Sequence, residues 1–160
     1  MKIGVVSDTH CHAIPKQVIN DFKNVDLIVH AGDFCTLAEA GIFENLKKVV
    51  GVYGNMDGED VRKKYPEKQV FECDGVKIGV YHGEGAKNGI LEKVKEKFAG
   101  DDVDVVIFGH SHEPLNKKIG NVLYFNPGSP NDNVFAPYRS YGILDVASGK
   151  AAAKIIKVKD

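Results

Sequence analysis

Seven residues whose side chains can bind metal ions stand just beyond short apolar runs of this sequence. Asp8 and His10 follow the run "IGVV", and His110 and His112 follow "DVVIFG". The whole set is Asp8, His10, Asp33, Asn55, His82, His110 and His112. Such β-branched runs are typical of buried strands, and in open α/β sheets ligands bind beyond the carboxyl ends of the strands. We therefore expect the seven side chains to converge at one edge of a sheet.

The number and the types of these side chains predict a site for two metal ions. Seven oxygen and nitrogen ligands exceed what one first-row transition metal needs, and they suit two ions that share a carboxylate. His110 and His112, which are separated by one residue, would then reach different ions. Glycines beside the ligands would let the backbone turn sharply and leave room for the ions. These glycines are Gly32, Gly54, Gly83 and Gly109.

The bulk composition is ordinary for a soluble globular protein and gives no sign of some kinds of partner. The chain has 160 residues, which fits one domain over 1–160, and 43% of them are hydrophobic. The net charge is −1, from 21 basic and 22 acidic side chains, and we find no basic run. We therefore expect neither a nucleic-acid nor a membrane partner.

The cysteines predict a protein without structural disulfides. Cys11, Cys35 and Cys73 are odd in number and have no C-x-x-C spacing. A disulfide framework and a zinc ribbon are therefore not expected, and we interpret Cys11 as incidental to the site. A reducing cytoplasm is the expected location.

The elements that would position the candidate ligands alternate along the chain. The pattern predicts strands over 3–6, 26–33 and 47–55, separated by helices over 15–24 and 36–46, with Thr36 as the N-cap of the second helix. This βαβαβ order implies a parallel sheet. The later elements expected are a short helix over 58–65, a hairpin over 68–83 that turns at Asp74 and Gly75, a helix over 88–100, a strand over 102–109, and strand pairs over 116–129 and 141–158. The fold class is thus α/β, with parallel strands first and antiparallel strands last.

Five short blocks also carry a family resemblance. In order, they are "SDTH", "HAGD", "GNMD", "HG" and "GHSH". Together they resemble the calcineurin-like metallophosphoesterases, and the compact length resembles their single-domain phosphodiesterase subfamily, which includes the retromer scaffold subunit. The resemblance implies a β-sandwich of two mixed sheets flanked by helices. It also implies a first ion held by Asp8, His10, Asp33 and His112, and a second held by Asp33, Asn55, His82 and His110.

The chain departs from this resemblance at one position. Many relatives carry a histidine directly after the motif asparagine, where it assists the leaving group, but this chain has Met56. Asp57 resembles the usual acidic residue that closes the motif. His12 lies near enough in sequence to His10 to contact a substrate phosphate, and we carry it with Asn55 as a candidate catalytic residue. His30 is expected to be a structural, hydrogen-bonded residue.

The hypothesis from the sequence is a binuclear metal-dependent phosphodiesterase. A hydroxide bridging the ions would attack phosphorus in line, while Asn55 and the ions hold the phosphoryl oxygens. Mn²⁺ is the first expected cofactor, and Ni²⁺, Fe²⁺, Co²⁺ and Zn²⁺ suit the same ligands. The expected partner is a small phosphodiester substrate, and a homo-oligomer is left open. The alternative hypothesis is a non-catalytic metal-binding scaffold for protein partners.

Overall fold

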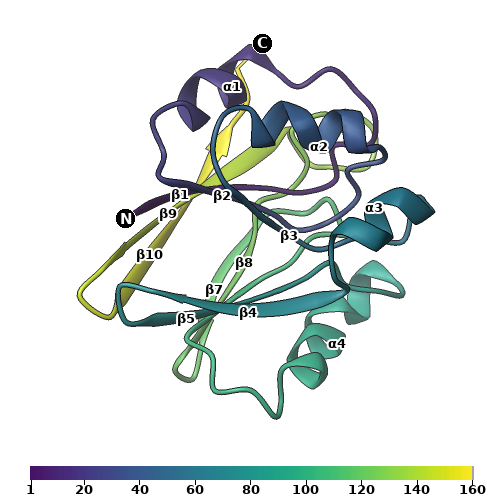
Figure 1. Cartoon of the computed structure of the whole chain (residues 1–160). Coiled ribbons are helices and arrows are strands. Elements are labelled where there is room, and N and C mark those ends of the chain that lie inside the picture. Colours follow the sequence, from purple (N-terminus) through teal and green to yellow (C-terminus); the bar gives the residue numbers. More distant parts are fainter. Residues whose placement is uncertain (160) are drawn as a thin grey trace.

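The apolar runs of the sequence form two five-stranded sheets that pack face to face (Figure 1). The structure is a computed structural model that describes residues 1–159; residue 160, which the expected domain includes, lies outside the described residues. Helices cover the outer faces of the sheets (Figure 1). The predicted fold class, two mixed sheets flanked by helices, is confirmed.

The first sheet holds the βαβαβ unit at the N-terminal end and the last two strands of the chain. Its strand order is β10-β9-β1-β2-β3, in which β1, β2 and β3 are parallel and β9 is antiparallel to β1 and β10. The strands are β1 (Lys2–Val6), β2 (Leu27–His30), β3 (Val49–Gly51), β9 (Ser140–Ala147) and β10 (Lys150–Lys157). Helices α1 (Lys16–Phe22) and α2 (Leu37–Glu44) connect the three parallel strands.

The second sheet has the strand order β4-β5-β6-β8-β7. Its strands are β4 (Lys68–Cys73), β5 (Val76–Tyr81), β6 (Val105–Ile107), β7 (Leu115–Ile119) and β8 (Val122–Asn126). The helical elements around it are α3 (Glu59–Lys64), the 3₁₀ helix η1 (Lys87–Gly89) and α4 (Ile90–Lys97). The two antiparallel pairs expected over 116–129 and 141–158 are present as β7 with β8 and β9 with β10. Strand β8 also pairs in parallel with β6, which is parallel to β5, so the later part of the chain is not purely antiparallel.

Alternating side chains join these layers. Ile3 and Val5 of β1 point into the core between the sheets, where they pack in one cluster with Ile78 and Ile107 of the second sheet. Val6 faces the other way and packs in a cluster with residues of α1. Because side chains on a strand alternate between the two faces, β1 is fixed on both sides. The loop that carries Asp8 and His10 therefore starts from a fixed point at the carboxyl end of β1.

Two local signals read from the sequence are confirmed. The side chain of Thr36 caps α2 by accepting a hydrogen bond from the backbone N–H of Glu39 at 3.3 Å. The hairpin of β4 and β5 turns at Asp74 and Gly75, which both have positive φ angles, as a tight two-residue turn requires. Within residues 1–159, none of the helices has the length and apolar character to span a membrane.

The packing of β9 against the second sheet predicts a clear stability difference between two glycines. A Cβ added at Gly142 would meet ring atoms of Phe125 at 2.5 Å, whereas one added at Gly41 in α2 meets nothing within 4 Å. Gly142→Ala should destabilise the protein by about 1–3 kcal/mol through overpacking. Gly41→Ala should stabilise it by about 0.5–1 kcal/mol, because alanine favours the helix. Urea unfolding of both variants checks this, and equal effects would contradict the packing.

Candidate metal centre

The loops that follow five strands meet at one edge of the sandwich and are tied to one another by their backbones. The N–H of Asp8, after β1, donates to the carbonyl of Gly32, after β2, at 3.0 Å. The N–H of Gly109, after β6, donates to the carbonyl of His82, after β5, at 2.9 Å. The N–H of His110 in turn donates to Asp8 Oδ2 at 3.1 Å. These bonds hold the loops of both sheets in fixed positions around Asp8.

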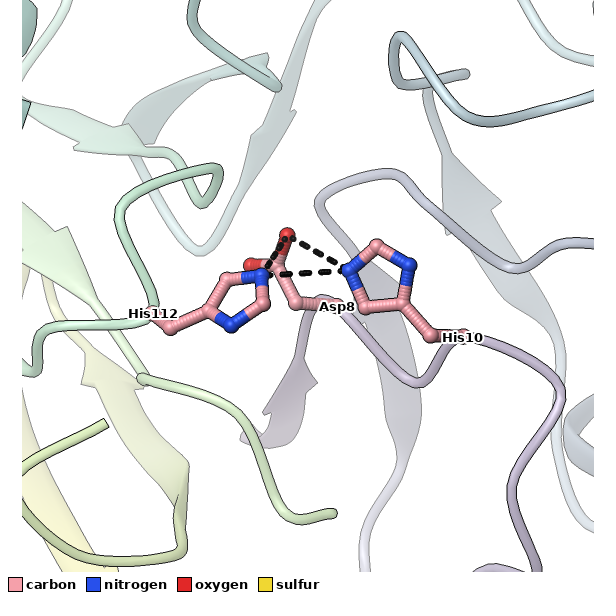
Figure 2. Close-up of side chains that lie close together, drawn as sticks. All are labelled: Asp8, His10 and His112. Atoms are coloured by element: carbon pink, nitrogen blue, oxygen red, sulfur yellow. Dashed lines mark hydrogen bonds and ion pairs between the residues drawn. The ribbon is translucent and has the colours of Figure 1, made fainter. Parts of the chain in front are cut away.

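Asp8, His10 and His112 form a first group of possible metal ligands (Figure 2). The Nε2 atoms of His10 and His112 are 3.1 Å apart. Asp8 Oδ1 lies 3.7 Å from Nε2 of His10 and 3.4 Å from Nε2 of His112. Ligand atoms bound about 2.1 Å from one ion lie about 3.0–3.4 Å apart in octahedral or tetrahedral geometry. The three atoms thus have nearly the spacing of ligands around one ion.

Asp8, Asp33 and His82 form a second group. His82 Nε2 lies 3.3 Å from Asp33 Oδ2 and 3.8 Å from Asp8 Oδ1. Asn55 Oδ1 adjoins this group, at 3.1 Å from His82 Nε2 and 3.0 Å from His110 Nδ1. The structure therefore brings all seven residues singled out in the sequence into one continuous cluster.

The two groups touch through both carboxylates. Asp8 belongs to both groups. Asp33 Oδ2 also faces both, because it lies 3.5 Å from Nε2 of His10 and 3.3 Å from Nε2 of His82. A bridging Asp33 stays a prediction, and Asp8 is a second residue placed between the two groups.

Three of the histidines have their other ring nitrogen fixed as a donor. His82 Nδ1 lies 2.7 Å from the carbonyl oxygen of Ala31, and His110 Nε2 lies 2.9 Å from that of Gly85. A carbonyl can only accept, so these nitrogens carry the protons. His112 Nδ1 similarly lies 2.5 Å from the carboxylate of Asp132. In the neutral rings the unprotonated nitrogens therefore face the cluster, an arrangement that is general for metal-binding histidines.

The electrostatics of the cluster show a shortage of positive charge. Asp8 is fully buried, and its Oδ1 atom has no hydrogen-bond partner. Burial raises the pKa of Asp8, but His10 and His112 outweigh this effect and hold the pKa below its usual range. Burial also acts to raise the pKa of Asp33, and the contact with His82 outweighs it. Both carboxylates are therefore ionised at neutral pH, and cations suit them.

The histidines respond in the opposite direction. Burial alone would lower the pKa of His112, but Asp8 and Asp132 raise it to about 9. The pKa of His82 is also raised, because the two aspartates outweigh its burial. In the protein without metal, protons on these rings balance part of the negative charge. Metal binding must displace them.

Backbone strain is concentrated at the same place. Nine non-glycine residues among 1–159 have positive φ angles. Five of them are candidate ligands, namely Asp8, His10, Asp33, His110 and His112. Each left-handed residue of this kind costs about 1–3 kcal/mol and persists only where the surroundings fix it, most often at functional sites. At Gly109 a side chain would collide, since an added Cβ would lie 1.9 Å from Ser7 Oγ.

Two carboxylates support the site in ways that the sequence does not predict: Asp132, which is not among the candidate residues, and Asp57, whose only sequence signal is its resemblance to the closing residue of the motif. Asp132 orients His112, and it lies between the strand pairs expected over 116–129 and 141–158, where the sequence predicts no element. Asp57 accepts the backbone N–H groups of Asp33, Cys35 and Gly54 at 2.9, 2.7 and 2.7 Å. It therefore ties the loop after β3 to the loop after β2, which gives a physical role to the closing residue of the "GNMD" block.

The remaining candidates have different surroundings. His30 is buried, its Nδ1 accepts the N–H of Gly32 and its Nε2 contacts Thr9 Oγ1 at 3.1 Å, so the structural role is confirmed. His12 is exposed and lines a pocket beside the ligand cluster. Met56 is 63% exposed, and its N–H donates to Asp33 Oδ1 at 2.8 Å.

The prediction that the cysteines form no disulfide is wrong for one pair. Cys11 and Cys35 are joined by a disulfide, with a Cα–Cα distance of 5.4 Å, and Cys73 is free. The two residues are separated by 24 positions in the sequence, so their spacing gives no signal. They meet because the loops after β1 and β2 lie side by side. Cys11 is therefore not incidental: the bond links the loop of His10 to the loop of Asp33.

The sheet order and the cluster at the strand ends define a metallophosphoesterase-type sandwich. Residues 1–149 match the calcineurin-like phosphoesterase superfamily domain. The chain is 38% identical over 167 residues to a probable metallophosphoesterase of Methanocaldococcus jannaschii, covering 100% of this chain and 83% of the relative. It is 35% identical over 145 residues to a phosphodiesterase of the same organism, covering 80% and 83%. The chain therefore belongs to the calcineurin-like phosphoesterase superfamily.

Solved structures agree with this assignment. A novel archaeal phosphodiesterase matches with a TM-score of 0.77 and 30% identity over 98% of this chain and 100% of its own. Vps29 of Entamoeba histolytica, solved as a complex with zinc, matches with a TM-score of 0.79 over 98% and 99% of the two chains. At 24% identity, the second likeness concerns the fold alone.

The raised pKa of His112 predicts how metal affinity depends on pH. An unperturbed histidine is neutral above a pH of about 6.5. His112, with a pKa of about 9, is still protonated at neutral pH. An ion that binds to Nε2 of His112 must therefore displace the proton from this ring. Apparent Zn²⁺ affinity of the chelator-stripped protein should rise about tenfold per pH unit from about pH 6.5 to 8.5. Titration against a competing chromophoric chelator measures this, and an affinity that levels off above pH 7 would contradict the assignment.

Proposed function

We propose that the protein is a binuclear metal-dependent phosphodiesterase. The observation that carries this proposal is the common direction of the histidines. Three of them direct one ring nitrogen at a fixed acceptor and turn the other toward the cluster. The second nitrogen of His82 faces Asp8 and Asp33, that of His112 faces Asp8, and that of His110 faces the amide oxygen of Asn55. A scaffold that binds no metal would have no need of this arrangement, whereas a metal-binding scaffold would share it. Homologues named as phosphodiesterases and metallophosphoesterases support the same reaction class.

The residues would divide into two ligand sets that share a carboxylate. One ion would be held by Asp8, His10, Asp33 and His112, and the other by Asp33, Asn55, His82 and His110. The ligand atoms are imidazole nitrogens, carboxylate oxygens and an amide oxygen, which suit Mn²⁺, Fe²⁺, Co²⁺, Ni²⁺ and Zn²⁺ alike, and Mn²⁺ is the ion we expect. When bound, the ions would supply Lewis-acid charge that lowers the pKa of water and offsets the charge of the phosphate.

The chain itself would position the substrate. Asn55 is exposed at the edge of the cluster, where its amide can also contact a phosphoryl oxygen. His12 is exposed in the adjacent pocket and is the candidate for a further contact with the phosphate. Residues 1–160 would act as one domain, since a single core cluster contains side chains from both sheets. A cytoplasmic location stays a prediction from the cysteine count, and the Cys11–Cys35 bond argues against it because cytosolic thiols are mostly reduced.

Replacing Asp33 tests the binuclear assignment. Asp33→Ala removes a carboxylate that faces both ligand groups, so metal content should fall below two ions per chain. Hydrolysis of bis(4-nitrophenyl) phosphate should fall by more than the roughly 10–100-fold that loss of an outer-shell partner costs. Metal analysis after gel filtration and steady-state kinetics measure both effects.

Asp145→Ala is the matched control, because the side chain of Asp145 lies on β9, is 59% exposed and pairs with Lys2. Its metal content and activity should equal those of the wild type. Normal metal content and turnover in Asp33→Ala would contradict the proposal. A wild-type protein that binds two ions but hydrolyses no phosphodiester would favour the alternative, a metal-binding scaffold for protein partners.

Met56 predicts a strong dependence on the leaving group. Its thioether cannot donate a proton, and its exposed side chain can be exchanged while the N–H bond to Asp33 stays. Met56→His should recover part of the roughly 10²–10⁴-fold that a general acid supplies for alkyl esters, with little change for aryl esters. Rates for diesters graded by leaving-group pKa, measured in both proteins, report this. Parallel plots would show that position 56 does not serve the leaving group.

A further inference from the structure

A pocket opens directly beside the ligand cluster and has a wall that the proposed reaction does not explain. Its volume is about 520 Å³. Asp8, His10 and His112 form one side. The other side is the loop after β8, and the pocket residues from this loop are Ser129, Asn131, Asp132, Asn133, Val134 and Phe135. A volume in this range is typical of small-molecule sites.

The pocket loop, residues 129–136, is attached to the loop of the metal ligands. Ser129 Oγ donates to the carbonyl of Asp8 at 2.8 Å, and Asn131 Nδ2 donates to the carbonyl of Thr9 at 2.7 Å. The first acceptor is the backbone of a candidate ligand, and the second is the backbone of the residue between Asp8 and His10. The pocket loop therefore has a defined position relative to the cluster.

Asp132 extends this order to the tip of the loop. Its Oδ1 atom accepts the N–H groups of Val134 at 2.7 Å and Phe135 at 3.0 Å, and its Oδ2 atom accepts that of Ala136 at 3.1 Å. The same carboxylate contacts His112 Nδ1 at 2.5 Å. One side chain thus fixes a candidate metal ligand and the backbone of Phe135 together.

The tip of the pocket loop presents apolar surface to the solvent. Val134 is 79% exposed and Phe135 is 70% exposed, more than any other large hydrophobic residue among 1–159. The amine of Lys87 lies 3.3 Å from the carbonyl oxygen of Phe135 and 5.9 Å from the centroid of its ring. The backbone of Phe135 is thus fixed at the edge of the pocket, and its exposed ring offers a flat surface for another ring.

We propose that this pocket binds a planar aromatic group of the phosphodiester substrate, such as the base of a nucleoside, stacked on Phe135. This inference rests on the proposed function, because the pocket is continuous with the ligand cluster where the phosphate would bind. That continuity favours a group carried by the substrate over a separate protein partner. In the part of the substrate that is not released, the base would lie against Phe135, and the sugar would span the distance from the base to the phosphate at the cluster.

Two substrates with the same leaving group isolate the contribution of the pocket. Thymidine 5′-(4-nitrophenyl phosphate) and methyl 4-nitrophenyl phosphate are both alkyl aryl diesters that release 4-nitrophenolate, but only the first carries a base. With Mn²⁺-loaded protein, kcat/KM for the thymidine ester should exceed that for the methyl ester by about tenfold, within the range for one base–aromatic stack. Phe135→Ala should bring the ratio close to one and leave the methyl ester unaffected.

Control variants show whether the effect belongs to the aromatic ring. Phe135→Tyr should keep the preference for the thymidine ester. Val70→Ala, which removes another exposed apolar side chain from β4 outside the pocket, should change neither rate. Equal rates for both esters in the wild type, or an unchanged ratio in Phe135→Ala, would overturn the aromatic subsite while the proposed diesterase activity stands.

Hydrolysis of neither ester would overturn the proposed diesterase activity. A binding measurement then still tests the aromatic subsite by itself. Saturation-transfer NMR of thymidine 5′-monophosphate with Zn²⁺-loaded protein should label the protons of the base in the wild type and lose this signal in Phe135→Ala. No saturation of the base in the wild type would overturn the subsite. Light scattering that shows a dimer in the wild type and a monomer in Phe135→Ala would do so as well, by assigning the ring to a contact between chains.

Discussion

Asp8 is a buried carboxylate with an oxygen atom that accepts no hydrogen bond. Removing an ionised carboxylate from water costs several kcal/mol unless charges and donors replace the water. Here the N–H of His110 satisfies Oδ2, while the rings of three histidines, His10, His82 and His112, approach Oδ1. The charge on Asp8 therefore has to be matched by protons on those rings or by bound cations. The loops around Asp8 carry the histidines that can hold either.

This constraint explains why the surrounding backbone is strained. Candidate ligands after β1, β2 and β6 have left-handed φ angles, and residues in this conformation need support from outside. The support comes from three sources. The core between the sheets fixes the strand ends, the hydrogen bonds of Asp57 join the loops after β2 and β3, and the Cys11–Cys35 bond joins the loops after β1 and β2.

The sequence predicted the candidate ligands because each one interrupts an apolar strand pattern at its end. It also predicted Thr36 as a helix cap and the turn at Asp74, since both depend on local hydrogen bonding and local φ angles. The strand expected over 47–55 was too long: β3 is Val49–Gly51, and the chain then leaves the sheet to bring Asn55 to the cluster. An apolar pattern cannot show where a strand stops pairing and a functional loop begins.

Features made by distant parts of the chain could not be read from spacing. Cys11 meets Cys35 only because parallel strands place their loops side by side, and Asp132 meets His112 across 20 positions from a loop without a recognisable pattern. The aromatic side of the pocket is of the same kind, because exposure of Phe135 depends on how Asp132 folds its loop. These are tertiary effects, which a single sequence does not reveal.

The central claim is that one cluster around two buried carboxylates holds two divalent ions. Anomalous X-ray diffraction from crystals of the Mn²⁺-loaded protein tests it most directly. The account predicts two anomalous peaks on either side of Asp33, one among Asp8, His10 and His112 and one between His82, Asn55 and His110. A single peak, or peaks away from these side chains, would contradict it.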